Sequence, residues 1–296
     1  MAGIDPFGSV RSDALSPGII RRAVRRFLAE DVGAGDVTTR SVVPHGLRGK
    51  GALVARESCV LAGLDVALAV FQMLDEDLHL EPKVRDGDRV AAAGVVAMIS
   101  GRTAPMLTGE RVALNLLQHL SAIATLTRRY VDAVAGTGVS ISDTRKTTPG
   151  LRLFDKHAVR VGGGRNHRFG LFDAVLIKDN HVAAAGGVRQ ALDAVRRARV
   201  SAPVQIEVDS LDQLSEALDV GIDAVLLDNM PPDTVAVAVD LIRRHETGGR
   251  CWIEASGGIT LVNVRLYAET GVDTISIGAV THSAPSVDLA LDLARS

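Results

Sequence analysis

A chain of 296 residues can bury a large core in one or two domains, and 47% hydrophobic against 23% charged residues is an ordinary globular composition. The formal net charge of −2 gives no support to non-specific nucleic-acid binding, so an anion site must come from local clusters of cations. No apolar run approaches the roughly 20 residues of a membrane helix, and Cys59 and Cys251 lie far apart without metal-ligand spacing. We therefore expect a cytoplasmic protein without a membrane span.

The first hundred residues carry the patterns of a small unit that mixes helices and strands. Residues 1–18 contain no apolar secretory core, and we expect them to form a flexible leader. Apolar residues at helical spacing, with arginines between them, predict a helix over 19–30. The elements expected next, in chain order, are a loop over 30–40, a strand over 49–56, a helix over 64–74, a strand over 78–84 and tight antiparallel strands over 86–101.

A long helix and then an alternating region make up the rest of the chain. A continuous apolar stripe predicts a helix from about 107 to 134, with Thr108 as its N-cap, that bridges two domains. Short apolar runs then alternate with helical segments up to about His282, and residues 287–296 are expected to form a short apolar helix. This alternation of strand and helix predicts a parallel sheet or barrel.

Six apolar runs in the second half each end in a polar or glycine-rich tip. Runs of this length are typical of strands buried on both faces, and in parallel sheets and barrels the carboxyl ends of the strands form the active face. We therefore expect the tips to converge in one mouth. The tip residues are Asp143, Thr144, Arg145, Lys146, Lys178, Glu207, Asp228, Ser256, Gly257, Gly258, Ile277, Gly278 and Ala279.

Cations are dense in two of the loops that this pattern places at the mouth. Arg145 and Lys146 directly follow one strand, and a guanidinium binds carboxylate or phosphate with two hydrogen bonds, whereas an ammonium acts as a point charge. Three glycines precede His167 and Arg168, and consecutive glycines let backbone N–H groups approach an anion. A solvated basic loop and a merely flexible glycine turn are the alternatives, and the preceding strands favour an anionic substrate instead.

Several of the tip residues leave more than one chemistry open. Glu207 and Asp228 suit a hydrated Mg²⁺ that bridges phosphates, or a buried ion pair with a lysine. Lys178 is either a substrate cation or, when desolvated, a Schiff-base nucleophile. His167 is an acid–base group, an orienting donor or a structural residue. The glycines of the last two tips favour a phosphate held on backbone amides.

An ordered set of segments resembles the quinolinate phosphoribosyltransferase family. The segments are EDVGAGDVTT, ERVALNLLQHLSAIAT, DTRKTTPGLR, GGGRNHRFGL with IKDNH, EVDS, LLDN, EASGGI and IGAVTHS, and they span nearly the whole chain after the leader. The resemblance implies an α/β sandwich domain over 19–121, rejoined by 283–296, and an incomplete (β/α) barrel of six to seven strands over 122–282. It also implies a homodimer and a Mg²⁺-dependent reaction, in which quinolinate and 5-phosphoribosyl-1-pyrophosphate give nicotinate mononucleotide, pyrophosphate and CO₂.

The same resemblance gives each tip a substrate group. Quinolinate is expected to bind through Arg111, reaching in from the partner subunit, and through Thr144, Arg145, Lys146, His167, Arg168 and Lys178. Phosphoribosyl pyrophosphate is expected to bind through Lys146, Glu207, Asp228, Ser256, Gly257, Gly258, Ile277, Gly278 and Ala279. Glu207 and Asp228 are the expected Mg²⁺ ligands, directly or through water, and Lys146, Lys178, Glu207 and Asp228 are the expected catalytic side chains.

Three alternative functions remain open on the sequence. The first is a Schiff-base lyase that uses Lys178, which borohydride trapping with a carbonyl substrate would detect. The second is a related phosphoribosyltransferase with another pyridine or base as acceptor. The third is a non-catalytic binding module, in which replacing Arg145 or Lys178 would change ligand affinity alone.

Overall fold

The computed structural model describes residues 15–246 and 251–295 and divides the chain into two compact units. One unit combines 13–128, 148–163 and 283–296, and the other combines 129–147 with 164–282. Most of the predicted leader, residues 1–14, lies outside the described residues. Residues 17 and 18 of that leader instead begin the first helix, α1 (Pro17–Val32), which has Ser16 as its N-cap.

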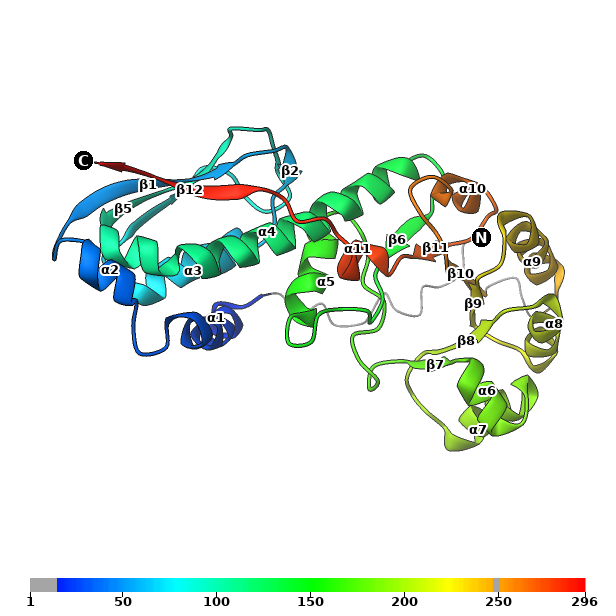
Figure 1. Ribbon diagram of the computed structural model, residues 1–296. Coiled ribbons are helices and arrows are strands. Elements are labelled where there is room, and N and C mark those ends of the chain that lie inside the picture. Colours follow the sequence, from blue (N-terminus) through cyan, green and yellow to red (C-terminus); the bar gives the residue numbers. More distant parts are fainter. Residues whose placement is uncertain (1–14, 247–250, 296) are drawn as a thin grey trace. The chain divides into compact units, whose positions relative to one another are not determined.

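The first unit is built on an antiparallel sheet with the strand order β12-β1-β5-β3. Helices α3 and α4 run along one face of this sheet (Figure 1). Gly109 of α4 meets the side chains of Phe71 and Leu74 on α3, so the two helices pack closely. The expected strands over 49–56 and 78–84 and the helix over 64–74 are confirmed. The elements are β1 (Arg48–Ala55), β2 (Cys59–Val60), α3 (Leu64–Leu74), β3 (His79–Pro82), β4 (Arg89–Val90), β5 (Val95–Arg102), α4 (Thr103–Ala133) and β12 (Leu289–Arg295).

The helix expected near the C-terminus is wrong, because these residues form strand β12, which pairs antiparallel with β1. Leu289, Leu291 and Leu293 recur at every second position, which is the period of a strand rather than of a helix. Leu291 and Leu293 pack over Gly51 of the neighbouring strand, where an added Cβ would lie 3.0 Å and 3.1 Å from their side chains. The apolar content was recognised in the sequence, but its period was not.

Two details near the start of the chain also differ from expectation. The predicted loop over 30–40 contains most of a short helix, α2 (Val37–Val42), which begins at Asp36 because that carboxylate accepts the Thr39 N–H at 2.8 Å. The long helix α4 begins at Thr103, so Thr108 is not its N-cap. Instead, the Thr108 hydroxyl donates to Asp36 at 3.1 Å and ties α4 to the start of α2.

Residues 148–163, which the sequence analysis places in the barrel domain, group with the first unit. Their helix, α5 (Arg152–Val161), is held by two histidine–aspartate contacts. His119 of α4 lies 2.8 Å from the buried Asp155, and His157 lies 3.0 Å from Asp86. Contacts between residues far apart in the chain decide this grouping, and the local sequence pattern does not contain them.

The second unit is a six-stranded parallel sheet with the order β6-β11-β10-β9-β8-β7. Strands β6 and β7 form its two edges, so within the described residues the sheet is open, and the predicted incomplete barrel is confirmed. Helices α8 and α9 lie on the outer side of β8 and β9 (Figure 1). The elements are β6 (Ser140–Ser142), β7 (Val175–Ile177), α6 (Asp179–Ala185), α7 (Val188–Ala198), β8 (Val204–Val208), α8 (Leu211–Val220), β9 (Ala224–Asp228), α9 (Pro232–Arg244), β10 (Trp252–Ser256), α10 (Val264–Ala268), β11 (Thr274–Ser276) and α11 (Ala279–His282).

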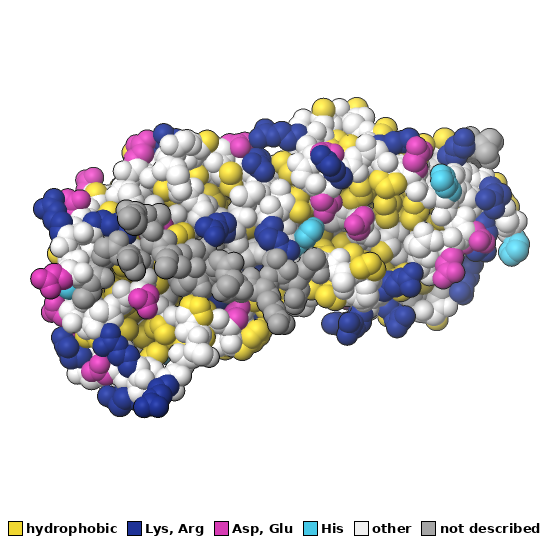
Figure 2. All heavy atoms as spheres, turned by 180° about the vertical axis from the view of Figure 1, so that it is seen from behind, with side chains coloured by type: hydrophobic (Ala, Val, Ile, Leu, Met, Phe, Trp, Pro, Cys, Tyr) yellow, Lys and Arg dark blue, Asp and Glu magenta, His cyan; other side chains and the backbone are white. Residues whose placement is uncertain are grey.

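Two further features of the described residues are their lack of a membrane-spanning helix and the distribution of their charged side chains. None of their helices combines the length and the apolar character needed to cross a membrane. Acidic and basic side chains are interspersed over the face seen in Figure 2, without a single continuous basic stripe.

Candidate active site

The parallel register brings the tips of neighbouring strands to one edge of the sheet. Glu207 of β8 pairs with Leu226 of β9, and Asp228 of β9 pairs with Ser256 of β10. Side chains two residues apart on a strand share a face, so Glu207, Asp228 and Ser256 all point to the inner side of the sheet. The chain direction thus places carboxylates and a hydroxyl around one opening, as the sequence predicted.

This opening is a cavity of about 480 Å³. Eleven of the predicted site residues line it: Thr144, Arg145, Lys146, His167, Arg168, Lys178, Glu207, Asp228, Ser256, Gly257 and Gly258. Five residues that sequence reasoning did not assign also line it: Leu176, Leu226, Asn229, Glu254 and Ser276. Cations and carboxylates therefore share one cavity within the second unit, and we take it as the candidate active site.

The loops that carry the cations are joined by a buried aspartate. Asp143, which is 0% exposed, accepts the backbone N–H of His167 at 2.8 Å and the side-chain amide of Asn166 at 2.7 Å. The loop after β6 and the loop before β7 are thereby held together. The Nε atom of Arg145 is buried and has no hydrogen-bond partner among the described residues. A buried guanidinium donor of this kind favours an anion from outside the chain.

His167 and Arg168 lie deep in the cavity wall, at 6% and 5% exposure. Both ring nitrogens of His167 are engaged: Nε2 lies 3.1 Å from Gln205 Oε1, and Nδ1 accepts the Arg168 N–H at 2.8 Å. Arg168 donates one guanidinium hydrogen bond to the Ala174 carbonyl at 3.0 Å. Burial, and then repulsion from Arg145, lower the pKa of Arg168, and both arginines line the same cavity.

The carboxyl ends of β8 and β9 carry the carboxylates Glu207 and Asp228. Lys178 Nζ lies 2.6 Å from Glu207 Oε2, which matches the ion-pair alternative left open by the sequence. Burial and the nearby negative charge of Glu207 raise the pKa of Asp228. Asn229, whose φ is 54°, donates its side-chain amide to Asp228 at 2.7 Å. Two carboxylates that line one cavity are well placed to hold a cation.

The glycine tip after β10 allows two loops to approach closely. A Cβ atom on Gly257, whose φ is 91°, would lie 2.1 Å from Asn229 Oδ1 and 2.7 Å from its backbone nitrogen. Only glycine fits this position. At the next tip, a Cβ on Gly278 would lie 2.9 Å from Lys146 Cδ, so the lysine stem packs against the glycine.

Four predicted site residues do not line the cavity. Ile277, Gly278 and Ala279 follow the end of β11, and Gly278 takes part through its contact with Lys146. Arg111 is exposed on α4 and belongs to the first unit. Of the residues that were not predicted, Asn229 and Glu254 stand inside the quoted segments LLDN and EASGGI, but no local signal distinguished them from their neighbours.

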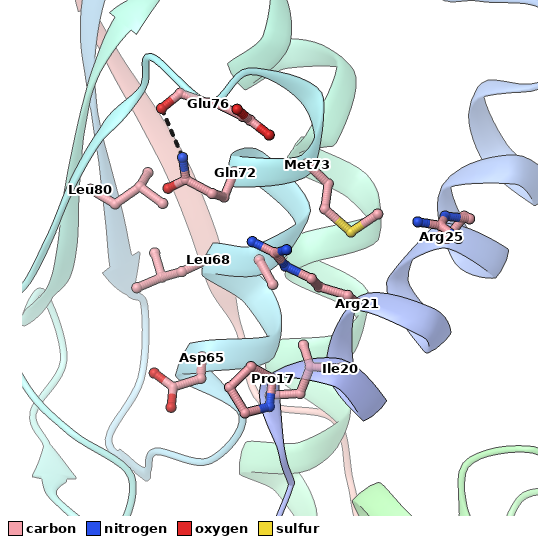
Figure 3. A pocket seen from close by; sticks show the side chains of 11 residues that line it. Pro17, Ile20, Arg21, Arg25, Asp65, Leu68, Gln72, Met73, Glu76 and Leu80 are labelled. Carbon is pink, nitrogen blue, oxygen red and sulfur yellow. Dashed lines mark hydrogen bonds between the residues drawn. The ribbon is translucent and has the colours of Figure 1, made fainter.

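A second cavity, of about 510 Å³, lies between α1 and α3 of the first unit (Figure 3). Leu68, Met73 and Leu80 contribute apolar surface, and Arg21 and Arg25 stand on the α1 side. Its arginines and Asp65 come from helix surfaces, and Glu76 comes from the turn after α3. It lacks the convergence of buried polar groups that distinguishes the cavity at the sheet.

Family models match almost the whole chain. The quinolinate phosphoribosyl transferase N-terminal domain matches residues 36–121, and the C-terminal domain of the same family matches residues 123–292. The second match contains every residue that lines the cavity at the sheet.

Individual relatives and solved structures agree with the family models. A nicotinate-nucleotide pyrophosphorylase (carboxylating) of Mycobacterium leprae is 47% identical over 92% of this chain and 96% of its own length. A probable enzyme of the same name from Synechocystis is 45% identical over 94% and 93%. The structure of the nicotinate-nucleotide pyrophosphorylase from Francisella tularensis has a TM-score of 0.89 at 36% identity, covering 96% of this chain and 99% of that chain.

Proposed function

Because the chain belongs to the quinolinate phosphoribosyltransferase family, we propose that it transfers phosphoribosyl from 5-phosphoribosyl-1-pyrophosphate to quinolinate and releases CO₂. The products would be nicotinate mononucleotide and pyrophosphate, on the route to NAD. One observation carries the proposal: Arg145, Lys146, Arg168 and Lys178 line a single cavity with two carboxylates. Quinolinate carries two carboxylates, and the donor carries a phosphate and a pyrophosphate, so this density of cations matches the charge to be bound.

The acceptor would bind where the guanidinium groups meet. Arg145 and Arg168 would take the quinolinate carboxylates in bidentate fashion, with Thr144 and Lys178 as further donors. The unpartnered Nε of Arg145 supports this placement. His167 lies beneath them with both ring nitrogens already bonded within the protein, so it would contribute to acceptor binding by its position.

The donor would bind at the tips of the last strands. Ser256, Gly257 and Gly258, together with Ile277, Gly278 and Ala279, would cradle the 5′-phosphate on backbone N–H groups. Lys146, whose stem packs on Gly278, would neutralise the pyrophosphate. Glu207 and Asp228 would hold ribose hydroxyls and stabilise the positive charge that develops on the ribose as pyrophosphate leaves.

Glu207 and Asp228 also fit a magnesium ion. The described residues contain no group of three or more His, Cys, Asp or Glu side chains that could hold a metal. We therefore propose that protein side chains supply only part of the magnesium coordination. Mg²⁺ usually keeps several waters and binds one or two carboxylates together with substrate phosphates. The presence of the Asp228 and Glu207 carboxylates in one cavity supports a cation there. When bound, the ion would neutralise pyrophosphate oxygens and favour their departure.

The reaction requires little proton transfer by the protein. The pyridine nitrogen carries its own lone pair and can attack C1′ without a general base. The resulting pyridinium withdraws electrons from the neighbouring carbon and thereby favours loss of CO₂, after which the electron pair left on that carbon would take up a proton from water. The side chains of this cavity would therefore act mainly by binding, orientation and charge stabilisation.

The direct test mixes the protein with quinolinate, phosphoribosyl pyrophosphate and Mg²⁺ and follows nicotinate mononucleotide and CO₂. We expect equal amounts of both products, and nicotinate should not replace quinolinate, because it lacks the second carboxylate. Folded protein that forms neither product would contradict the proposal. Turnover of nicotinate, or of another base in place of quinolinate, would instead favour the related phosphoribosyltransferase.

The Schiff-base alternative is less compatible with the geometry. A nucleophilic lysine needs a neutral, desolvated amine, whereas Lys178 is 45% exposed and pairs with Glu207. Borohydride treatment with carbonyl substrates should leave no adduct at this residue. The binding-module alternative predicts no turnover at all, so the product assay also separates it from the proposal.

We also infer a homodimer in which Arg111 completes the acceptor site of the partner subunit, and we place the reaction in the cytoplasm. Arg111 is exposed and outside the unit that holds the cavity, yet a third arginine would suit a dianionic acceptor. Mixing inactive Arg111→Ala and Lys178→Ala proteins should restore about a quarter of the wild-type activity, because random exchange makes half the dimers mixed and each mixed dimer has one intact site. No recovery, after mass spectrometry confirms subunit exchange, would exclude the shared site.

A further inference from the structure

A buried carboxylate beneath the acceptor end of the cavity has no part in the proposed reaction. Glu254 lies in β10, two residues before Ser256, and is 0% exposed. Burial alone would raise the pKa of Glu254, but the contacts with His167 and the Gln205 amide outweigh this effect and lower that pKa. A charge buried in this way is retained only where specific partners hold it.

The partners of Glu254 form a short network across three segments. Its Oε2 atom accepts the Gln205 side-chain amide at 2.9 Å and lies 3.3 Å from His167 Nε2. Gln205 returns its own carbonyl oxygen to the same His167 nitrogen at 3.1 Å. Two oxygens thus face one ring nitrogen, which therefore carries a hydrogen and donates it.

The other ring nitrogen of His167 passes this constraint to Arg168. Nδ1 accepts the Arg168 backbone N–H at 2.8 Å, which leaves Nε2 as the ring nitrogen that carries a hydrogen. The backbone N–H of His167 donates to Asp143, so hydrogen bonds hold both the ring and the backbone of His167. The guanidinium of Arg168 is one of the two that we propose to bind quinolinate. The path from Glu254 to the substrate therefore runs through His167 to Arg168.

The second oxygen of Glu254 faces a small polar space. Glu254 Oε1 and Trp252 Nε1 are buried without hydrogen-bond partners among the described residues, and both residues line a cavity of about 10 Å³. Ser140, Ser142 and Thr274 contribute hydroxyl groups to it. A space of this size and polarity suits one water molecule, which would accept from the indole and donate to the carboxylate. Such a water would complete the support of the carboxylate.

We propose that Glu254 is a positioning residue for acceptor binding, which orients His167 and through it the Arg168 guanidinium. The inference rests on the proposed function, because it assigns Arg168 to quinolinate. It predicts that loss of the carboxylate impairs acceptor binding and leaves the donor end of the cavity intact. It also explains how His167 can support quinolinate binding although neither of its ring nitrogens is free to bind quinolinate.

The test compares Glu254→Met, which removes the acceptor atoms at similar length, with Glu254→Gln, whose amide oxygen can still accept from His167. Glu254→Met should raise the KM for quinolinate about tenfold, with kcat and the KM for phosphoribosyl pyrophosphate within twofold of wild type. Calorimetric affinity for quinolinate alone should fall equally. Glu254→Gln should restore the quinolinate KM to within about threefold. Gln205→Leu, which removes the second partner, should show the same selective loss and serves if Glu254→Met does not fold.

Ser121→Ala provides the control, since Ser121 is also fully buried but bonds to the backbone of Ala62 and lines neither cavity. It should leave both KM values unchanged. Equal losses in kcat and in both KM values for Glu254→Met, or an unchanged quinolinate KM, would overturn the inference. Absence of turnover by wild-type protein would instead overturn the proposed function, so the two failures are distinct.

Discussion

Replacing Lys178 by alanine should lower kcat/KM for quinolinate by on the order of 10²-fold to 10³-fold, the usual effect of removing one charged donor from a preorganised site. The substitution removes a cation that we propose to bind quinolinate. Because the ammonium lies 2.6 Å from Glu207, its loss also removes a positive charge beside the Glu207 and Asp228 carboxylates. Both effects act in the same direction. Initial rates at varied quinolinate and saturating donor would measure the change.

Lys178→Arg is the control for this variant, because it keeps the charge but alters the donor geometry. It should retain at least a tenth of the wild-type kcat/KM if Lys178 acts as a substrate cation. A Schiff-base role would make the arginine variant as inactive as the alanine variant. Activity of Lys178→Ala within threefold of wild type would contradict any role of this residue in the reaction.

Replacing Gly257 by alanine should weaken the donor site and destabilise the protein by about 2–4 kcal/mol. The added Cβ would stand 2.1 Å from Asn229 Oδ1 and 2.7 Å from the Asn229 backbone nitrogen, and the positive φ adds strain. Displacing Asn229 would also disturb its bond to Asp228. We expect the KM for phosphoribosyl pyrophosphate to rise at least tenfold, as measured by initial rates, with stability measured by urea unfolding.

Gly186→Ala separates strain from contact. Gly186 has a similar φ of 90°, but a Cβ there would meet nothing within 4 Å, and the residue ends α6 away from the cavity lining. It should cost only about 1–2 kcal/mol and leave the donor KM unchanged. If both variants lost the same stability and kept the wild-type KM for phosphoribosyl pyrophosphate, the close approach of Gly257 to Asn229 would not contribute to donor binding.

Strand polarity is why much of the cavity could be predicted from the sequence. Lys178, Glu207 and Asp228 each follow or end an apolar run, and parallel strands carry such ends to the same edge. Glu254 could not be assigned in this way, because it stands inside an apolar strand and its partners, Gln205 and His167, are 49 and 87 residues away. Its role depends on register between strands, which one sequence does not contain.

Local patterns also predicted much of the fold, within limits set by their range. Helix α3 and strand β1 follow from periodicity alone, and both were placed within one residue. The helix predicted over the residues of strand β12 is wrong because their apolar content was used and their period of two was not, and pairing with β1 agrees with that period. The placement of α5 with the first unit depends on His119 and His157, whose partners are distant in sequence.

Because residues 148–163 belong to the first unit, the two units cannot be separated by a single cut in the chain. Among the described residues, the chain passes between the units after 128, 147, 163 and 282. The two middle passages flank the segments that end at Lys146 and begin before His167. No continuous fragment can therefore contain the complete cavity without also carrying a helix whose partners lie in the other unit. Exchange of either unit between relatives, or insertion of a tag at these passages, would act directly on the cation-bearing loops.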